Sequence, residues 1–300
     1  MPILIRIAVK ARNFLDRTIL KNKPRAWKIG NTVLSFPREH LLPVILKKHP
    51  EYAQNIVRLS KAVYEKYPDL KVIDVGGNVG DTSSFIRSSC PSSPIASIDG
   101  DEKFFSFLEK NALAVENVSV FKMFLGDKEG DFSAEMKNEN GTMKIFSEKT
   151  GENKIKISTL DKFVKENPKW KNAKLLKIDA DGFDFKIIRG GKDYLRTAKP
   201  VIFFEYARSE FEHLGEKGLD TMETLFNLGY EKIVYYDNYG RFLLSADLAD
   251  KKLISELNYY TPGKSYGRTF PYYDVAVFHK EDSALFENFS RKEMERNRET

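Results

Sequence analysis

Asp74-Val75-Gly76-Gly77-Asn78-Val79-Gly80-Asp81 is the stretch that decides the fold, and it links a short apolar run to a helical stretch. A strand that ends in a glycine-rich turn before a helix lets backbone N–H groups approach a ligand closely, because no Cβ lies between them. A dinucleotide fold would have the second glycine of its Gly-x-Gly-x-x-Gly motif where this chain has Asn78. Asp74, at the end of the strand, would also repel a pyrophosphate. The stretch therefore disfavours a nicotinamide-dependent oxidoreductase and favours a ligand with positive charge.

S-adenosylmethionine is such a ligand, since it carries a sulfonium and an ammonium but no phosphate. We expect the carboxylate of Asp74 to hold the ammonium of its methionine moiety, directly or through a water. The next strand ends at Asp99, 25 residues further on, where a carboxylate can accept hydrogen bonds from both ribose hydroxyls. Asp127 could accept a hydrogen bond from the adenine amine, although a plain turn acid explains it equally well. The predicted cofactor-binding residues are Asp74, Gly76, Gly77, Asn78, Gly80, Thr82, Asp99, Gly100 and Asp127.

Short apolar strands alternate with helical segments over most of the chain beyond residue 70. Such alternation predicts an α/β fold, with a mostly parallel sheet covered by helices on both faces. Residues 131–157 differ and are predicted to form a hairpin insert with its tip around 138–141. The predicted strands are 71–75, 95–99, 118–121, 175–178, 200–204, 233–236 and 275–278, and helices are predicted near 51–66, 102–114, 184–189 and 219–228.

The composition of the 300 residues is that of a cytoplasmic, soluble globular protein. A single cysteine, Cys90, excludes an internal disulfide and a cysteine-rich metal site. The net charge of +6 is concentrated in residues 1–28, which hold eight Lys or Arg and one acid. This distribution argues against a nucleic-acid channel across the main domain. It indicates a basic N-terminal arm, with an amphipathic helix over 3–22 that either contacts anionic lipid at a membrane surface or covers the main domain or a second subunit.

Several motifs resemble those of the FkbM-type S-adenosylmethionine-dependent methyltransferases. Asp74–Asp81 followed by Thr82-Ser83 is similar to the opening motif of that family. Ile98–Phe104 is similar to its second motif, although the family more often has Glu where this chain has Asp99. Three further matches are Ile157–Asp161, the Lys-Ile-Asp run within Leu175–Asp184, and the strand Lys199–Glu205.

The resemblance covers roughly residues 70–205 and implies a class I methyltransferase, Rossmann-like fold. It implies a seven-stranded sheet whose last strand, 275–278, runs antiparallel to its neighbours. It also implies O-methylation, commonly of a sugar or polyketide hydroxyl. We therefore expect a basic helical N-terminal extension over 1–68, a methyltransferase domain over 69–280 and a charged, helix-prone and frayed tail over 281–300.

Three carboxylates follow the predicted strand 175–178, in the run Asp179-Ala180-Asp181-Gly182-Phe183-Asp184. Asp179 is the candidate general base, because the carboxyl ends of parallel strands form the ligand-binding edge of open α/β sheets. The alternatives are a divalent cation held by Asp179 and Asp181, and a helix cap formed by Asp181 or Asp184. Glu205 could face the acceptor or orient the base, and His213 has the intrinsic pKa of a base. The predicted catalytic residues are Asp179, Glu205 and His213.

The leading interpretation is an O-methyltransferase that acts on a hydroxyl of a sugar, in a glycan, a glycolipid or a natural product. The alternative is a non-catalytic cofactor-binding scaffold that the basic arm recruits to a membrane or a partner. The sequence leaves the acceptor, the metal requirement and the oligomeric state open.

Overall fold

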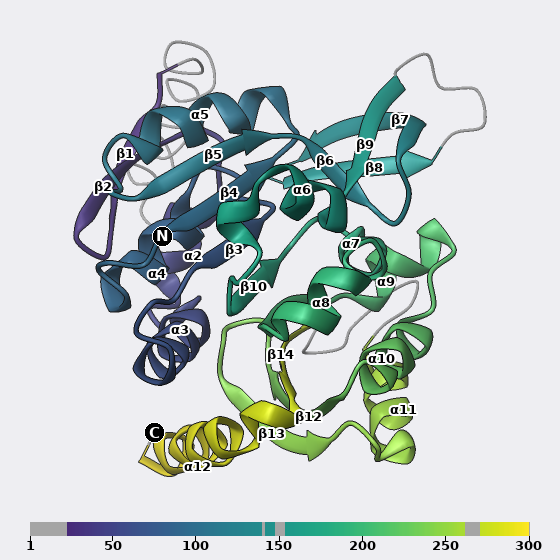
Figure 1. Ribbon diagram of the computed structural model, residues 1–300. Helices are drawn as coiled ribbons and strands as arrows, with labels where there is room; N and C mark the ends of the chain where they lie inside the picture. Colours follow the sequence, from purple (N-terminus) through teal and green to yellow (C-terminus); the bar gives the residue numbers. More distant parts are fainter. Residues whose placement is uncertain (1–22, 140–141, 148–153, 262–270, 300) are drawn as a thin grey trace, which may run out of the picture.

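Eight strands form the central sheet of the computed structural model (Figure 1). The structure describes residues 23–139, 142–147, 154–261 and 271–299; for His213, Glu299 and residues 133–139 and 142–147 it describes only the backbone. The strand order across the sheet is β13 (Phe242–Asp247), β12 (Tyr230–Tyr236), β14 (Tyr273–His279), β11 (Val201–Tyr206), β10 (Leu175–Ile178), β3 (Val72–Val75), β4 (Ile95–Asp99) and β5 (Val118–Lys122).

The pairing of these strands confirms a mostly parallel sheet with an antiparallel last strand. The strands from β11 to β5 pair in parallel, and β14 runs antiparallel to both β11 and β12. The sheet has eight strands, one more than the expected seven. The chain reverses at Asp237, whose Oδ1 accepts hydrogen bonds from the backbone N–H groups of Tyr239 and Arg241. That turn returns the chain as β13, which pairs antiparallel with β12 as an added edge strand.

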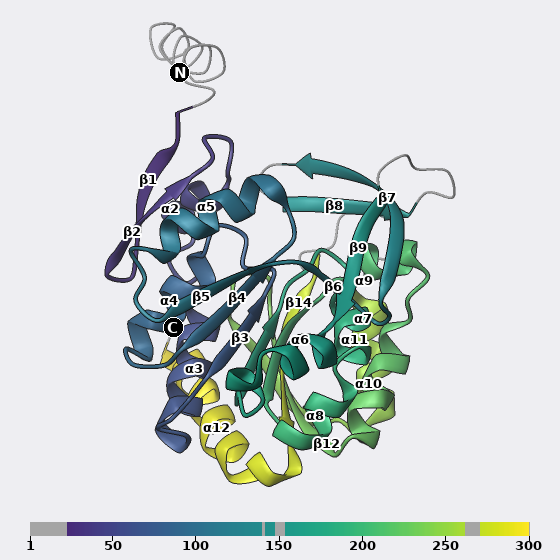
Figure 2. The ribbon, with the colours of Figure 1, turned by 45° about the horizontal axis from the view of Figure 1, so that its top comes forward.

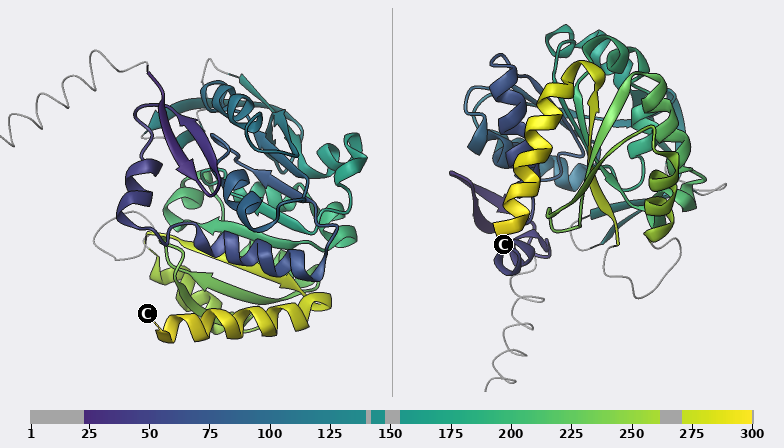
Figure 3. Two further views of the ribbon diagram at one scale, coloured as in Figure 1. Left: turned by 90° about the vertical axis from the view of Figure 1, so that its left-hand side faces the viewer. Right: turned by 90° about the horizontal axis from the view of Figure 1, so that it is seen from below.

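Helices cover both faces of the sheet, as predicted. Figure 3 shows α3 and α12 side by side on one face, with α10 and α11 on the other. The helices are α2 (Leu42–Lys48), α3 (Gln54–Lys66), α4 (Asp81–Ser89), α5 (Glu102–Ala112), α6 (Leu160–Glu166), α7 (Asp184–Arg189), α8 (Lys192–Ala198), α9 (Arg208–Phe211), α10 (Gly218–Asn227), α11 (Lys251–Tyr260) and α12 (Ser283–Glu299), with short 3₁₀ turns at Pro168–Trp170, Glu212–Leu214 and Lys280–Asp282. Within the described residues, none of these helices is both long and apolar enough to cross a bilayer.

The predicted hairpin insert is confirmed and belongs to a second, four-stranded sheet. Its strands, in the order β6-β9-β7-β8, are β6 (Phe124–Gly126), β9 (Lys154–Thr159), β7 (Gly130–Glu139) and β8 (Thr142–Ser147). β6 follows β5 almost directly and contacts α7, so the small sheet stands beside the carboxyl edge of the main sheet (Figure 2). Residues 140–141, at the tip of the hairpin, lie outside the described residues.

The N-terminal extension is not all helical, and the expectation for residues 25–36 is wrong. They form the antiparallel hairpin β1 (Arg25–Ile29) and β2 (Thr32–Phe36), which turns at Gly30 with φ of +55°. The side chain of Asn111, on α5, donates hydrogen bonds of 2.8 Å to the carbonyls of Ser35 and Val79, so the hairpin is tied to the glycine-rich turn. The predicted helix over 3–22 lies outside the described residues, and its contact with lipid stays a prediction.

The C-terminal tail is also not frayed over the described residues. Residues 283–299 form α12, whose apolar side chains Leu285, Phe286 and Phe289 are buried against the sheet. Glu293 of this helix accepts hydrogen bonds of 2.6 and 2.7 Å from Arg58 of α3. The helical character expected for the tail is confirmed, whereas the fraying is wrong, because the few apolar residues fall on one face of the helix and pack against the sheet.

Candidate active site

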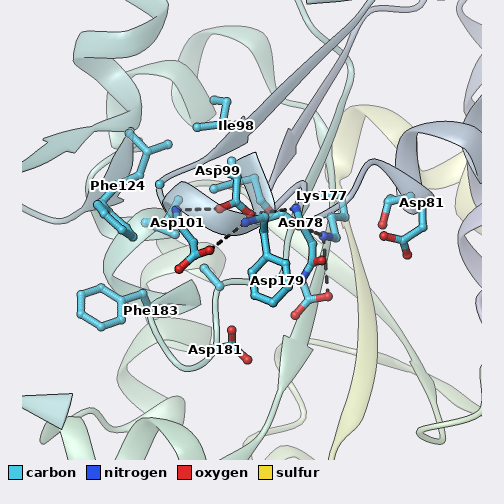
Figure 4. Close-up of a pocket in the computed structure, with 18 of the residues that line it drawn as sticks. Asn78, Asp81, Ile98, Asp99, Asp101, Phe124, Lys177, Asp179, Asp181 and Phe183 are labelled. Atoms are coloured by element: carbon cyan, nitrogen blue, oxygen red, sulfur yellow. Dashed lines mark hydrogen bonds and ion pairs between the residues drawn. The ribbon is translucent and has the colours of Figure 1, made fainter. Parts of the chain in front are cut away.

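The carboxyl ends of β3, β4 and β10 open onto one cavity of about 380 Å³ (Figure 4). A volume of this order is typical of a small-molecule site. Figure 4 shows Phe124 and Phe183 on one side of Asp99, and Lys177 and Asp81 on the other. Of the predicted site residues, the cavity is lined by Gly76, Asn78, Thr82, Asp99, Gly100, Asp179 and Asp181.

Asp99 ends β4, and backbone hydrogen bonds fix both oxygens of its carboxylate. Oδ2 accepts from the backbone N–H of Asn78 at 2.7 Å, and Oδ1 accepts from that of Asp101 at 2.9 Å. Each oxygen keeps a second lone pair for a ligand in the cavity. Burial raises the pKa of Asp99 to about 6, and the two N–H groups partly oppose the rise. This arrangement is suited to accepting hydrogen bonds from a vicinal diol such as a ribose.

Asp74 does not contact the cavity, which corrects the expectation that it holds an ammonium group directly. Its side chain is 0% exposed, and Lys177 of β10 lies 3.3 Å from its Oδ1. Ser83 and Ser97 also donate hydrogen bonds to its Oδ2, at 3.1 and 3.3 Å. Lys177 further donates to the carbonyl of Gly76 at 2.9 Å. Asp74 is therefore an internal counter-ion that fixes Lys177 beneath the glycine-rich turn.

Two glycines of the site are required by close contacts. Gly76 has φ of +74°, and a Cβ there would lie 1.7 Å from the carbonyl oxygen of Asp179. A Cβ on Gly100 would lie 2.4 Å from the ring of Phe124. Gly77 and Gly80 belong to the same turn but do not line the cavity, so their expected contact with a cofactor is corrected to a role in packing the turn.

Asp127 does not line the cavity, so the structure does not support its expected contact with an adenine amine. Its carboxylate lies 3.3 Å from the guanidinium of Arg189, which also forms hydrogen bonds of 2.6 and 2.8 Å with Glu216. The end of the cavity beside Asp99 has apolar walls instead. They consist of Ile98, Phe104, Met123, Phe124, Leu125, Ile155, Ile157, Phe183 and Ile187. These walls suit a flat apolar ring.

The acids that follow β10 divide into two groups. Asp179 and Asp181 line the cavity, and the Asp179 side chain is 52% exposed, with Oδ2 3.6 Å from Lys177. Asp184 is buried at the start of α7, where its carboxylate accepts a 3.2 Å hydrogen bond from the backbone N–H of Ala180. Burial raises the pKa of Asp184 to about 7. Asp184 forms no side-chain cap on α7, so the structure does not support the capping alternative for it, and its bond to Ala180 fixes the loop after β10 instead. Asp179 and Asp181 remain the two acids of this run that line the cavity.

Glu205 is not brought to the cavity as a catalytic residue. Glu205 lines a separate space of about 10 Å³ with Asp184 and Phe211, and burial raises its pKa well above the ordinary value. The His213 side chain lies outside the described residues. Where the structure describes side chains, no group of three or more His, Cys, Asp or Glu is placed to hold a metal ion. Asp179 and Asp181 belong to no such group, so no step is assigned to a cation.

The sequence did not indicate that residues before the glycine-rich turn form one wall of the cavity. The wall is made of His40, Leu41, Leu42, Ile45 and Tyr52, from the β2–α2 connection, α2 and the turn before α3. Asp81, the first residue of α4, also lines the cavity, and burial raises its pKa to about 7. Asp81 belongs to the glycine-rich stretch, so the sequence could have identified it as a site residue. His40 and Tyr52 belong to no motif and follow no predicted strand, so no sequence signal marked them as part of the site.

Residues 74–232 match the family described as the methyltransferase FkbM domain, which is more than half of the chain. The chain belongs to the FkbM methyltransferase family. Its strand order, with β14 antiparallel, is the class I methyltransferase fold that the sequence implied. The FkbM domain begins at Asp74 and ends within β12, so the wall that contains His40 and Tyr52 lies outside it.

Individual relatives of this FkbM-family chain are distant. Methyltransferase 1 of Beauveria bassiana (strain ARSEF 2860) is 23% identical over an alignment of 148 positions, which covers 42% of this chain and 59% of that protein. The chain thus spans less than two thirds of the relative's length. The structure of methyltransferase FkbM from Methylobacillus flagellatus KT is 11% identical, with a TM-score of 0.44 over 78% of this chain and 60% of that one. The precorrin-6y C5,15-methyltransferase of Geobacter metallireducens GS-15 is 13% identical, with a TM-score of 0.40 over 76% of this chain and 89% of that one.

Proposed function

We propose that this protein is an S-adenosylmethionine-dependent O-methyltransferase that acts on an uncharged sugar-type hydroxyl. The observation that carries the proposal is the placement of two acids in one cavity. Asp99 is held by backbone N–H groups beside apolar walls, whereas Asp179 is accessible beside Lys177.

The residues of the cavity fit S-adenosylmethionine better than a phosphate-bearing cofactor. Asp99 would bind the ribose hydroxyls, and the apolar walls beside it would enclose the adenine. Lys177 is the one Lys or Arg among the described residues that line the cavity, and its charge is already balanced by Asp74 and Asp179. A pyrophosphate would therefore meet five lining aspartates, Asp81, Asp99, Asp101, Asp179 and Asp181, while the single lining lysine is already paired. A cationic cofactor without phosphate meets favourable charge.

The chemistry then depends on Asp179. When bound, the cofactor supplies a methyl group on a positively charged sulfur, and transfer forms an oxygen–carbon bond as the carbon–sulfur bond breaks. Asp179 accepts the proton of the acceptor hydroxyl and later releases it to water, a contribution of roughly 10²–10⁴-fold in rate. Lys177, 3.6 Å from Asp179 Oδ2, holds the carboxylate in place.

The acceptor class follows from the same charges and from the family resemblance. The acidic residues at the Asp179 end repel an anionic acceptor such as a sugar phosphate, since Lys177 is already engaged. A neutral, hydroxyl-rich acceptor avoids this repulsion. Tyr52, which lines the same end, offers a phenol that stays protonated, because burial raises its pKa and Asp274 and Asp179 add to the rise.

Two measurements test the proposal. Isothermal titration with S-adenosylhomocysteine should show binding, and a lack of binding at millimolar ligand would reject the cofactor assignment. A transfer assay with tritiated methyl donor should then compare neutral glycans, sugar phosphates and amines, each with and without EDTA. Label on neutral glycans supports the proposal, whereas label on amines alone would overturn the O-methyl assignment, and loss of label with EDTA would contradict the metal-free role of Asp179.

A further inference from the structure

His40 is buried between the hairpin β1–β2 and helix α2, and both nitrogens of its ring have partners. The side chain is 7% exposed. The backbone N–H of Leu42 donates to Nδ1 at 3.2 Å, and Nε2 lies 3.1 Å from the side-chain oxygen of Asn78. Because a backbone N–H can only donate, Nδ1 must accept, and the proton of the neutral ring is on Nε2. His40 therefore donates a hydrogen bond to Asn78 Oδ1.

Asn78 is the residue that His40 holds, and its backbone conformation is unusual. Its φ is +48°, in the left-handed region that non-glycine residues seldom adopt. In this conformation its backbone N–H donates to Asp99 Oδ2 at 2.7 Å. Asn78 thus joins His40 to the carboxylate that faces the cavity, with one hydrogen bond on each side.

The His40 ring is held rigidly enough to act on Asn78. It contacts Phe36 and Phe104 edge to face, with ring centroids 5.3 and 6.0 Å apart, and both phenylalanines are buried. Neither ring nitrogen is left for a ligand, so His40 contributes to the site by holding Asn78. His40 also precedes the FkbM domain, which begins at Asp74.

We propose that His40 is a positioning residue that sets the affinity for the cofactor, by holding Asn78 so that its backbone N–H fixes Asp99. The proposal rests on the proposed cofactor site and adds to it a residue from the segment before the FkbM domain. It predicts a loss of cofactor affinity without a change in the transfer step. A residue that only stabilised the fold would not lower cofactor affinity while leaving the rate of methyl transfer unchanged.

Two variants of His40 separate the two hydrogen bonds. In His40→Gln the side-chain amide can still donate to Asn78, whereas in His40→Asn the shorter side chain can accept from Leu42 N–H but cannot reach Asn78. We expect His40→Asn to weaken S-adenosylhomocysteine binding roughly 10-fold and His40→Gln to bind within about 3-fold of wild type. The kcat at saturating cofactor should stay unchanged in both. His49→Asn is the matched control, because His49 stacks on Tyr239 and does not line the cavity.

The variant Asn78→Gly, which keeps the positive φ, tests the route through Asn78. His40→Asn should add little further loss in that background, since the link is already broken. Equal binding by wild type and His40→Asn, or fully additive losses with Asn78→Gly, would overturn the proposal while leaving the cofactor site intact. Absence of binding by wild type would instead overturn both proposals. Thermal melting of each variant confirms that it is folded.

Discussion

The two ends of the cavity hold their acids by different means. At the β4 end, Asp99 is fixed by two backbone N–H groups, next to apolar walls. At the β10 end, Asp179 has a single neighbouring cation, Lys177, and its side chain is half exposed. Backbone donors cannot rotate away, so they suit a carboxylate that only binds. A carboxylate that must take up and release a proton needs access to water, which the half-exposed Asp179 has.

The largest expected effect is on the β10 end. Asp179→Asn removes the proton acceptor, so kcat should fall about 10²–10⁴-fold, whereas S-adenosylhomocysteine affinity should change little. Single-turnover kinetics and isothermal titration measure the two quantities. Asp69→Asn, at an exposed position, is the control. Full activity of Asp179→Asn would contradict the assignment of proton transfer to the β10 end of the cavity.

The buried pair beneath the glycine-rich turn should give the next largest effect, on stability. Lys177→Met leaves Asp74 without its counter-ion, and the free energy of unfolding should fall by about 3–5 kcal/mol. The double variant with Asp74→Asn should regain part of that loss, because no unpaired charge then remains. Urea denaturation of the two variants measures both values. If Lys177→Met were as stable as wild type, the ion pair between Lys177 and Asp74 would not stabilise the glycine-rich turn.

The β4 end should show a moderate effect on binding. Asp99→Asn turns one acceptor oxygen into a donor against a backbone N–H, so S-adenosylhomocysteine affinity should fall about 10–100-fold. In wild type the affinity should fall as the pH drops below about 6, because Asp99 then becomes protonated. Titrations between pH 5 and 8 test this. A pH profile as steep in Asp99→Asn as in wild type would assign the titration to another group.

The smallest effect concerns Asp274, on β14 near the β10 end. Burial raises its pKa to about 7, above the ordinary value near 3.8, so the folded state holds a proton that the unfolded state has lost. Its stabilising contribution is present at low pH and disappears as the pH rises through about 7. Asp274→Asn should therefore raise the free energy of unfolding by roughly 1–3 kcal/mol at pH 8 and by less than half as much at pH 5.

Urea denaturation at the two pH values measures the Asp274 effect. The exposed Asp131→Asn serves as the control. The amide can still accept the 2.8 Å hydrogen bond that Asn55 donates to Asp274, so the change is confined to charge. Equal stabilisation at pH 5 and pH 8 would show that packing, and not ionisation, is responsible.

Much of the fold could be predicted because local patterns decide it. The strand over 175–178 and the helix over 184–189 have the bounds that the apolar runs and the charged residues indicated. β13 was missed because it is an edge strand with partly exposed side chains, so its sequence lacks a buried apolar run. The helix of the tail was expected, but its packing as α12 was not, because its few apolar residues are separated by many charged ones along the sequence.

The site was predicted less completely than the fold. The sequence indicated which acidic residues belong near the site, but not which of them form ion pairs with basic side chains. Sequence order placed Asp74 and Asp99 at neighbouring strand ends, and both are there. Only the folded chain shows that Lys177, about a hundred residues from Asp74, neutralises the first acid and leaves the second facing the cavity. Asp127 likewise forms an ion pair with Arg189, a partner that the sequence did not indicate.

The amino-acid sequence by itself determined the parallel sheet, the glycine-rich turn and the acids at the strand ends, because each depends on neighbours within a few residues. The tertiary structure alone decided which acid faces the cavity and which residues complete its wall. The physical reason is that burial and ion pairing depend on side chains brought together from distant segments. His40, more than thirty residues before the turn, reaches Asn78 only because the hairpin β1–β2 packs against α5.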